Sequence, residues 1–227
     1  MLITGGSGYL GRHLCRIAAK NHTVHTTFFS HADSVSAGQA HPLNITDPIA
    51  VRSLMARLRP EAVIHCAAAN PGSDERRMMA VNRDGAANIA ASAAEYRARL
   101  VHVSTDMVHD GRHAPYLPTA QPTPINPYGK SKAAAEAAVI VANPAAAIVR
   151  TSLIFGLDEM DRGTAGFAQR LQAGDPLTLF EDHIRQPVWV QTLADALLKL
   201  AVNRPTIAGV LNVAGGQALS RAEVGER

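Results

Sequence analysis

The chain opens with a short apolar strand that runs directly into three glycines spaced three residues apart, Gly5, Gly8 and Gly11. An apolar helical pattern beginning at Leu10 follows, so the glycines stand between a strand and a helix. In such a turn Gly5 permits the tight bend, Gly8 lets the backbone approach a pyrophosphate, and Gly11 lets the helix pack closely on its strand. The helix then directs its N–H groups and the positive end of its dipole at the anion. The segment therefore predicts a phosphate-binding turn.

Composition limits the class of protein. A chain of 227 residues has room for one substantial α/β domain with a small appended lobe, and its 47% apolar and 18% charged residues are far from a disordered composition. No apolar run approaches the roughly 20 residues of a membrane span, and no leader precedes the first strand, so we expect a cytoplasmic protein. The net charge of +3 comes from scattered residues, which argues against nucleic-acid binding. Cys15 and Cys66 lack partners at ligand spacing and are expected to be buried, reduced thiols.

Apolar segments rich in β-formers alternate with alanine-rich helical segments, and this alternation predicts βαβ units and a parallel sheet. Two of the strands, Ala62–Cys66 and Leu100–Ser104, are nearly continuous apolar runs, as expected when helices cover both faces. The expected helices include Pro48–Leu58 and Val81–Tyr96. The fold class is therefore α/β, a Rossmann-type doubly wound parallel sheet with its functional groups at the carboxyl ends of the strands.

Residues 1–155 are expected to form an NAD(P)-binding domain, and residues 156–227 a small, partial substrate-binding lobe interleaved with the last sheet elements. The proline-rich segment His109–Pro127 predicts a long surface loop, and loops of this length are usually functional. Ser220–Glu223 is a capping box that predicts a new helix, although the sequence stops at Arg227 within about its first turn. We therefore expect that the chain is truncated or that its tail is not included.

Tyr128 and Lys132 lie four residues apart at the start of a strong helix-forming segment, so both side chains project from one helix face. A free phenol with a pKa of about 10 is a poor acid–base group at neutral pH, but a nearby cation favours the phenolate. At about 4 Å and an effective dielectric of 20, one charge contributes on the order of 4 kcal/mol, which is roughly three pKa units. The pair is therefore a candidate for proton transfer near pH 7.

A hydroxyl about two dozen residues upstream stands at the end of the Leu100–Ser104 strand, beside the expected nucleotide crevice. Thr105 is the preferred residue there and Ser104 the second choice. The predicted chemistry is hydride transfer to a carbonyl carbon, with Tyr128 donating the proton and Thr105 orienting the oxygen.

The second strand indicates which nicotinamide cofactor is bound. NAD enzymes usually carry an acidic residue at the end of this strand to accept hydrogen bonds from the ribose 2′-OH, but here no acid occurs before Asp33. Arg12, Ser30 and His31 are instead suited to hold a 2′-phosphate. The sequence therefore favours NADP over NAD.

Together these segments resemble one family, the extended short-chain dehydrogenase/reductases, and within it the dTDP-4-dehydrorhamnose reductase-like (RmlD-like) branch. The resemblance covers Leu2 to about Glu223. It is carried by the glycine turn and by the segments Arg59–Ala68, Val81-Asn82, Val103–Val108, Pro124–Lys132 and Val149–Ser152.

The resemblance implies roles for individual residues. Thr105, Tyr128 and Lys132 match the catalytic trio, with Lys132 also holding the nicotinamide ribose. Asn82 matches an asparagine that supports the active site from its helix. With the turn and the 2′-phosphate candidates, the implied cofactor-binding set is Gly5, Ser7, Gly8, Tyr9, Leu10, Gly11, Arg12, Ser30, His31, Asn44, Ile45, Ala67, Ala68, Asn82, Lys132 and Ser152.

The resemblance also bears on metals, substrate and assembly. Cys15 occupies the first-helix position where some members carry an acidic metal ligand, so no metal is expected. Arg185 matches a position bordering the substrate lobe and is suited to pair with a substrate phosphate. The family further implies a homodimer in which the helices near Val81–Tyr96 and Tyr128–Ala142 build a four-helix contact.

Three functions remain open at this stage. The first is an NADP-dependent reductase of a carbonyl substrate, such as a keto-sugar nucleotide. The second is a sugar-nucleotide epimerase or dehydratase, which Asp106 after Thr105 leaves possible. The third is a regulatory subunit that binds NADP without turnover, similar to the beta subunit of methionine adenosyltransferase, which also keeps the Tyr-Gly-Lys-x-Lys stretch.

Overall fold

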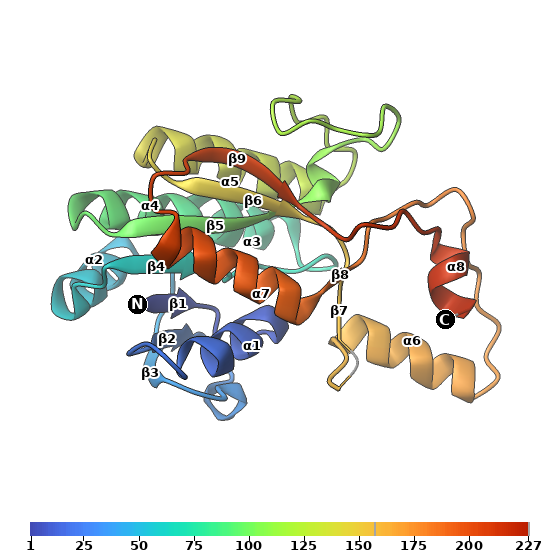
Figure 1. Cartoon of the computed structure of the whole chain (residues 1–227), viewed down its shortest axis with the longest axis horizontal. Helices are drawn as coiled ribbons and strands as arrows, with labels where there is room; N and C mark the ends of the chain where they lie inside the picture. The colour runs from blue at the N-terminus through green and yellow to red at the C-terminus, as the bar shows by residue number, and fades with distance from the viewer. Residues whose placement is uncertain (157, 227) are drawn as a thin grey trace.

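A doubly wound parallel sheet forms the centre of the computed structural model, which describes residues 1–156 and 158–226 (Figure 1). Within this part of the chain the main sheet has seven strands in the order β3-β2-β1-β4-β5-β6-β9, and every neighbouring pair is parallel. The strands are β1 (Leu2–Thr4), β2 (His25–Phe28), β3 (Gln39–Pro42), β4 (Ala62–His65), β5 (Arg99–Thr105), β6 (Ala147–Thr151) and β9 (Gly209–Val213). The strand order reverses between β1 and β4, so the predicted Rossmann-type fold class is confirmed.

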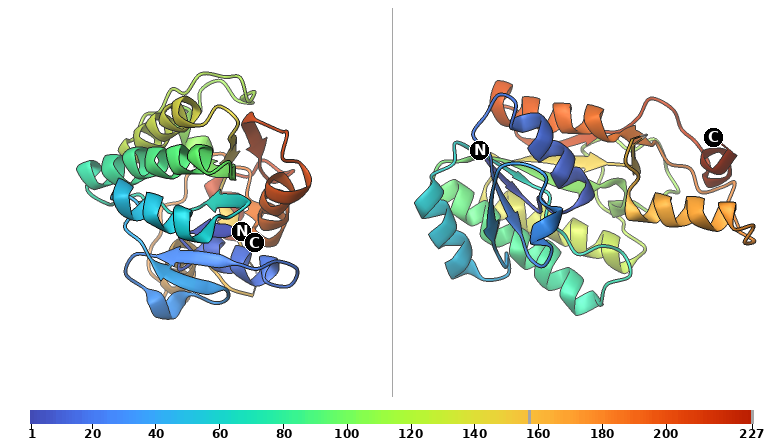
Figure 2. Two further views of the ribbon diagram at one scale, coloured as in Figure 1. Left: turned by 90° about the vertical axis from the view of Figure 1, so that its left-hand side faces the viewer. Right: turned by 90° about the horizontal axis from the view of Figure 1, so that it is seen from below.

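Helices cover both faces of this sheet (Figures 1 and 2). On one face α1 (Tyr9–Ala18) packs against α7 (Val190–Leu198), and their apolar side chains form one buried cluster with the strands. On the other face α2 (Pro48–Leu58), α4 (Ala86–Glu95) and α5 (Pro127–Ala142) form a second buried cluster. The strands between the two layers are buried on both faces, which explains their continuous apolar sequences.

Local capping explains where the helices begin. The side chain of Asp47 accepts hydrogen bonds from the N–H groups of Ile49 and Ala50 at the start of α2, and Pro48 occupies the first helical position. At α5 the same arrangement recurs with Asn126, which accepts from the N–H of Gly129 at 2.8 Å. The predicted bounds of the Pro48–Leu58 helix are confirmed because these signals are local in sequence.

The segment predicted as one helix over Val81–Tyr96 differs in the structure. A short helix α3 (Glu75–Met78) begins after the cap Asp74, and a π-helical stretch η2 (Met79–Gly85) joins it to α4. A Cβ at Gly85 would lie 2.6 Å from the Ile45 side chain, so this stretch packs unusually closely on the loop after β3. A π-helical turn carries no periodic signature in the sequence and is common at functional sites.

Most of the remaining elements extend from the carboxyl edge of the sheet (Figure 1). The remaining elements are the 3₁₀ turns η1 (Ala32–Ser34) and η3 (Asp106–Val108), the π-helical end η4 (Lys199–Asn203) of α7, the paired strands β7 (Ile154–Phe155) and β8 (Val188–Trp189), and the helices α6 (Arg162–Gln172) and α8 (Arg221–Glu226). The predicted capping box is confirmed, because the N–H of Ser220 donates to the Glu223 carboxylate at 2.6 Å and the N–H of Glu223 donates to Oγ of Ser220. Residues 157 and 227 of the predicted substrate lobe lie outside the described residues.

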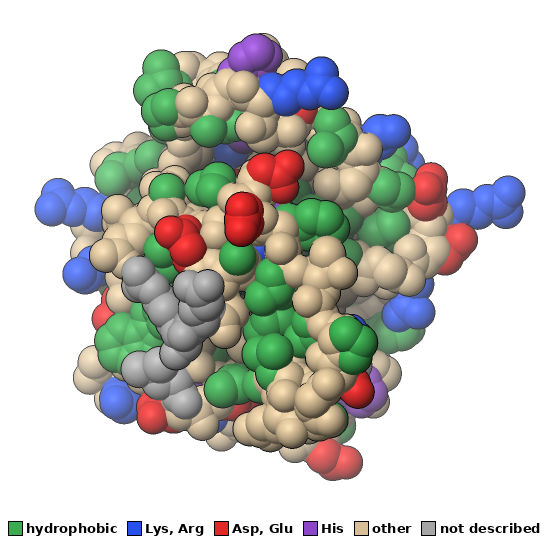
Figure 3. All heavy atoms as spheres, turned by 90° about the vertical axis from the view of Figure 1, so that its right-hand side faces the viewer, with side chains coloured by type: hydrophobic (Ala, Val, Ile, Leu, Met, Phe, Trp, Pro, Cys, Tyr) green, Lys and Arg blue, Asp and Glu red, His purple; other side chains and the backbone are tan. Residues whose placement is uncertain are grey.

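Exposed apolar side chains occur in the segment between α6 and β8. Phe180 and Ile184 are more than half exposed, and Figure 3 shows hydrophobic side chains gathered beside acidic ones on that face of the molecule. Cys66, expected to be buried, is half-buried, whereas Cys15 is buried and both thiols are free. None of the helices in the described ranges has the length and apolar character needed to cross a membrane.

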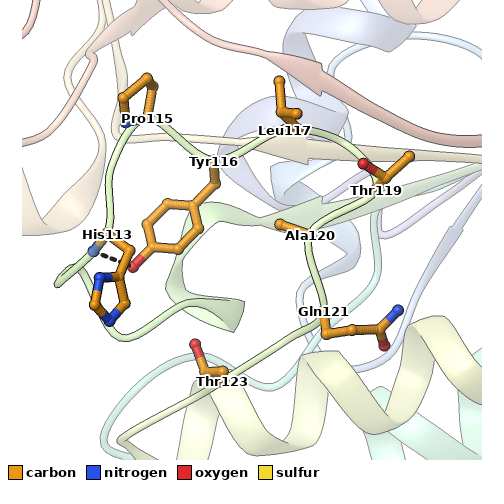
Figure 4. Close-up of a pocket in the computed structure, with 8 residues that line it drawn as sticks. All are labelled: His113, Pro115, Tyr116, Leu117, Thr119, Ala120, Gln121 and Thr123. Carbon is orange, nitrogen blue, oxygen red and sulfur yellow. Dashed lines mark hydrogen bonds between the residues drawn. The ribbon is translucent and has the colours of Figure 1, made fainter.

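The predicted long loop is confirmed between η3 and α5, over residues 109–126. Arg150 in β6 ties this loop down by donating to the carbonyl oxygen of Ala120 at 3.1 Å and by contacting Nε2 of His109. The His109 ring stacks on Tyr116 with centroids 4.0 Å apart, and the Tyr116 hydroxyl donates to Asp110. The loop encloses an open hollow of about 330 Å³, lined by side chains between residues 113 and 123 (Figure 4).

Candidate active site

The glycine turn follows β1, at the point where the strand order reverses. Gly5 has φ +73°, and a Cβ there would lie 2.8 Å from the backbone nitrogen of Ala67 after β4. A Cβ at Gly11 would overlap the carbonyl oxygen of Gly5. Both positions therefore require glycine, the first for its backbone conformation and the second for the close approach of α1 to the turn.

The start of α1 is free to bind an anion. Its N-cap residue Gly8 offers no side-chain hydrogen bond to the first turn, while the N–H of Gly8 itself donates to the carbonyl oxygen of Gly5. The first-turn N–H groups, which include those of Tyr9 and Leu10, lack a side-chain cap. Together with the glycine turn they fit the pyrophosphate of a dinucleotide.

Asn82 joins the backbone after β4 to α5, the helix that carries the candidate catalytic residues. Its side chain accepts from the N–H of Ala69 at 2.7 Å and donates to the carbonyl oxygen of the same residue. It also donates to Oγ of Ser131 at 2.8 Å, and Ser131 in turn donates to the carbonyl oxygen of Tyr128. The predicted supporting asparagine is thus buried in the π-helical stretch, with its amide directed at the protein.

The structure brings Thr105, Tyr128 and Lys132 to the carboxyl end of β5. Thr105 is the last residue of the strand, and α5 starts directly over it. A Cβ at Gly129 would overlap the carbonyl oxygen of Met107, so glycine allows the helix start to approach the strand end closely. Tyr128 is half-buried and Lys132 is buried.

The phenol of Tyr128 is a weaker acid in the structure than the sequence argument predicts. Burial and, second, the Asp106 carboxylate raise its pKa to about 12, while Arg185 opposes the change. Lys132 is not among the groups that shift this pKa, and its ammonium donates to the carbonyl oxygen of Val103 at 2.7 Å. A protonated phenol at neutral pH is nevertheless the state required to donate a proton.

Lys132 sits in an environment that disfavours its charge. Burial lowers its pKa from 10.5 to about 8, and Glu136, one turn further along α5, opposes this shift. The ammonium therefore loses its proton just above neutral pH.

A polar network that the sequence analysis did not assemble lies beside Tyr128. Asp106 receives a bidentate contact from Arg185, with Nε at 2.9 Å and Nη2 at 2.7 Å, and it accepts from Oγ of Ser152 at 2.6 Å. Thr105 also donates to Asp106 at 3.3 Å. The predicted substrate-phosphate residue Arg185 and the predicted cofactor-binding residue Ser152 are thus joined through one carboxylate, a link that residue spacing does not reveal.

The residues predicted to hold a 2′-phosphate differ in whether their side chains already have a partner in the protein. The guanidinium of Arg12 forms an ion pair with Glu159 and donates to the carbonyl oxygen of Ser7 at 3.0 Å. Arg12 is therefore engaged by the loop before α6, because Glu159 supplies the nearest anion. Ser30 and His31 are exposed after β2.

Asn44 and Ile45, two of the predicted cofactor-binding residues, also differ from each other in their surroundings. The Asn44 side chain accepts from both the N–H and the hydroxyl of Thr46, which orders the turn before α2. Ile45 is buried against the π-helical stretch. Among the described residues, no group of three or more His, Cys, Asp or Glu side chains is placed to hold a metal ion.

A glycine turn after β1 at the strand reversal and a Tyr-x-x-x-Lys helix over the end of β5 define a dinucleotide-binding protein of the short-chain dehydrogenase/reductase class. A family model described as the RmlD substrate binding domain matches residues 1–227. The chain belongs to this RmlD-like family of extended short-chain dehydrogenases/reductases, as its sequence features suggest.

The chain is similar to known proteins over nearly its whole length. It is 36% identical to a dTDP-4-dehydrorhamnose reductase of Mycolicibacterium smegmatis over 97% of its length and 65% of that protein. It is 29% identical to the methionine adenosyltransferase 2 subunit beta of Xenopus tropicalis over 98% of its length and 69% of that protein. The chain thus spans about two thirds of the length of these relatives.

A solved structure is similar throughout the fold. The dTDP-4-dehydrorhamnose reductase of Bacillus anthracis in complex with NADP superposes with a TM-score of 0.82 and 26% identity, covering 99% of this chain and 78% of the other.

Proposed function

We propose that this protein is an NADP-dependent reductase that converts the keto group of a sugar nucleotide to an alcohol. The observation that carries the proposal is the placement of Thr105, Tyr128 and Lys132 at the edge of the sheet that also holds the glycine turn. The reductases among its relatives act on dTDP-4-keto sugars according to their names, and they cover most of this chain. A dTDP-linked 4-keto sugar is therefore the substrate class to test first.

The chain's own groups account for the proton side of such a reduction. A bound NADPH supplies the hydride that reduces the carbonyl carbon. Tyr128 gives its hydroxyl proton to the carbonyl oxygen, and Thr105 holds that oxygen by a hydrogen bond. Lys132 places a positive charge near the phenol and offers an N–H to the nicotinamide ribose.

NADP is the proposed cofactor. No acidic residue occurs at the end of β2 to repel a 2′-phosphate, and a relative of the same fold has been solved with NADP. Ser30 and His31 are the residues proposed to meet the 2′-phosphate, since the Arg12 guanidinium is paired with Glu159.

Loss of NADPH absorbance on adding dTDP-4-keto sugars tests the proposal directly. We expect turnover by the wild-type chain and a loss of about 10²- to 10⁴-fold in Tyr128→Phe, because the proton donor is removed. Tyr96→Phe, at the end of α4, is the matched control and should turn over normally. Absence of turnover with every substrate, despite tight NADPH binding, would reject the reductase assignment.

A sugar-nucleotide epimerase or dehydratase is the second candidate, favoured by the Asp106 carboxylate beside Tyr128. Such an enzyme retains its cofactor through the cycle. It would convert a sugar nucleotide without a net change in NADPH absorbance, and product analysis by NMR would detect this conversion.

A regulatory subunit is the third candidate, favoured by the similarity to the methionine adenosyltransferase 2 subunit beta over nearly the whole chain. It would bind NADP without turnover and co-purify with a larger enzyme. Pull-down of a catalytic partner by both the wild type and Tyr128→Phe would support this function.

Organisation and assembly are proposed on the same basis. Residues 1–155 hold the cofactor and the part after residue 155 supplies the substrate lobe.

Two copies pair through α4 and α5, where Val141 is 84% exposed. The protein works in the cytoplasm. Light scattering of wild type and Val141→Glu tests the dimer, which the substitution should dissociate.

A further inference from the structure

A row of polar side chains crosses the otherwise apolar layer beneath α4 and α5. Thr4 of β1, His65 of β4 and His102 of β5 are paired in register on three adjacent strands. Each of the three is at most 1% exposed. The Nδ1 of His65 and the Oγ1 of Thr4 are 2.6 Å apart, and the rings of His65 and His102 are 5.2 Å apart at their centroids. The row ends at Lys132, whose Nζ lies 3.5 Å from Nε2 of His102.

Lys132 has three N–H donors and only few acceptors within its buried surroundings. One N–H donates to the carbonyl oxygen of Val103, and Nε2 of His102 is the side-chain acceptor within reach. If these two contacts hold two of the three N–H groups, the third is left for the phenol and the cofactor ribose. Both acceptors come from β5, so they fix the ammonium relative to the strand that ends in Thr105.

The hydrogen-bond pattern specifies the tautomer of His102. An ammonium only donates, so Nε2 of His102 must accept and its proton must lie on Nδ1. Nδ1 of His102 and Nε2 of His65 are buried without a partner among the described residues, and they lie on the two neighbouring rings of the row. With His65 donating from Nδ1 to Thr4, its Nε2 is an acceptor that complements the N–H of His102. The two hydrogen bonds of the row therefore run in one direction, from Lys132 to His102 and from His65 to Thr4, while Nδ1 of His102 and Nε2 of His65 stay without a partner among the described residues.

We propose that His102 is a positioning residue that accepts a hydrogen bond from Lys132 and thereby aims the ammonium at Tyr128 and the nicotinamide ribose. The proposal rests on the proposed oxidoreductase function, in which Lys132 touches cofactor and phenol. It adds a residue that touches neither and acts only through Lys132.

The groups around Lys132 keep His102 in its accepting form. Burial and the Lys132 charge lower the pKa of His102 well below its ordinary value, so the ring stays neutral. Besides Tyr128 on the same helix, the titratable groups that face Lys132 are His102 and His65 from the strands, Cys66 directly after β4, and Glu136 from α5. The charge of Glu136 is itself matched by Arg150. His102 is thus the one neutral ring in hydrogen-bond reach of the ammonium among the described residues.

Two substitutions separate this role from packing. His102→Leu keeps the volume but removes the acceptor, and His102→Gln restores an acceptor through its amide oxygen. NADPH binding, followed by fluorescence from acid to alkaline pH, reports the Lys132 charge without turnover. We expect the alkaline loss of binding to move down by about one pH unit in His102→Leu and to return towards wild type in His102→Gln. The kcat should fall about tenfold in His102→Leu with little change in the KM of the sugar nucleotide.

His41→Leu is the matched control, because it removes a second buried histidine from the edge strand β3, where its partner is His25. It should leave the pH curve unchanged. If folded His102→Leu follows the wild-type curve, or if His102→Gln shifts as much as His102→Leu, the proposal is overturned.

A measurement on the unaltered protein covers the case in which His102→Leu does not fold. In ¹⁵N NMR spectra at about pH 7, His102 should be neutral with its proton on Nδ1. A proton on Nε2 would overturn the proposal. Lys132→Met separates a failure of this proposal from a failure of the proposed function. If Lys132→Met binds NADPH and turns over like the wild type, the proposed function itself is refuted. If Lys132→Met loses binding and turnover while the His102 variants behave like the wild type, only the positioning role is refuted.

Discussion

Arg150 and Glu136 form an ion pair at 2.8 Å between β6 and α5, and their side chains are only 4% and 3% exposed. Ser104 donates to the same carboxylate at 2.5 Å, and Arg150 also reaches the carbonyl oxygens of the 109–126 loop. The pair thus joins the helix of Tyr128, the strand beside it and the loop in front of it. Its removal should affect both stability and the order of that loop.

Glu136→Gln leaves the Arg150 charge buried without its partner. We expect a loss of about 3–5 kcal/mol in the free energy of unfolding, measured by urea denaturation. The double variant Glu136→Leu/Arg150→Met should recover most of this loss because no buried charge remains. Arg52→Ala, which breaks the exposed pair with Glu95, is the control and should leave the urea midpoint unchanged. Equal effects of the buried and exposed substitutions would contradict the prediction.

Lys132→Met should stabilise the protein at neutral pH while abolishing the proposed activity. The folded-state pKa of Lys132 is about 8 against 10.5 for the free side chain, so below pH 8 the folded state holds a charge that burial disfavours. The unfolded state binds more protons between these values, and wild-type stability therefore rises with pH across that window. We expect a gain of about 2–3 kcal/mol for Lys132→Met at about pH 7, which shrinks as the pH rises above about 8 and is lost near pH 10.5, in urea titrations at several pH values.

Acid should destabilise the protein through His65. Burial and the Lys132 charge lower its pKa from 6.5 to about 3, so the unfolded state takes up a proton first as the pH falls. Stability is lost progressively from about pH 6.5 downwards, by up to about 1.4 kcal/mol for each pH unit. His65→Leu should flatten the pH dependence of the thermal midpoint in this range. His22→Leu, at an exposed position, should keep the wild-type slope.

Asp106→Asn should lower the pKa of the Tyr128 phenol. The carboxylate is the second cause, after burial, that raises this pKa to about 12, and the substitution removes its charge while leaving Arg185 nearby. Tyrosinate absorbance against pH measures the change, and because the chain has four tyrosines, the contribution of Tyr128 is isolated by subtracting Tyr128→Phe spectra. Asp195→Asn in α7 removes an equal charge elsewhere. An unchanged titration in Asp106→Asn would refute the assigned electrostatic cause.

Signals that act over a few residues made much of the fold predictable. The glycine turn, the Asp47-Pro48 start of α2 and the Ser220–Glu223 capping box depend on neighbours within a helical turn, and each is found as expected. The edge strand β3 was missed because Gln39–Pro42 has no apolar run, and an edge strand needs none. The π-helical stretch was missed because a π-helical turn carries no periodic signature in the sequence.

The candidate site follows the same division. The residue types at Thr105, Tyr128 and Lys132 were identified from spacing and resemblance, whereas their surroundings depend on contacts between distant segments. Arg185 meets Asp106 across 79 residues and Arg12 meets Glu159 across 147. No periodicity encodes such pairs, so the raised pKa of Tyr128 and the engaged guanidinium of Arg12 appear only in three dimensions.

The position of β9 makes the two parts of the chain inseparable. This strand comes from beyond residue 155, yet it pairs with β6 in register along its whole length and closes that side of the sheet. A fragment cut after Phe155 would present the N–H and C=O groups of β6 to any other strand, which invites aggregation. Residues 1–155 are therefore not an autonomous module, and an exchange of the part after residue 155 between relatives would have to keep Gly209–Val213 with the first part.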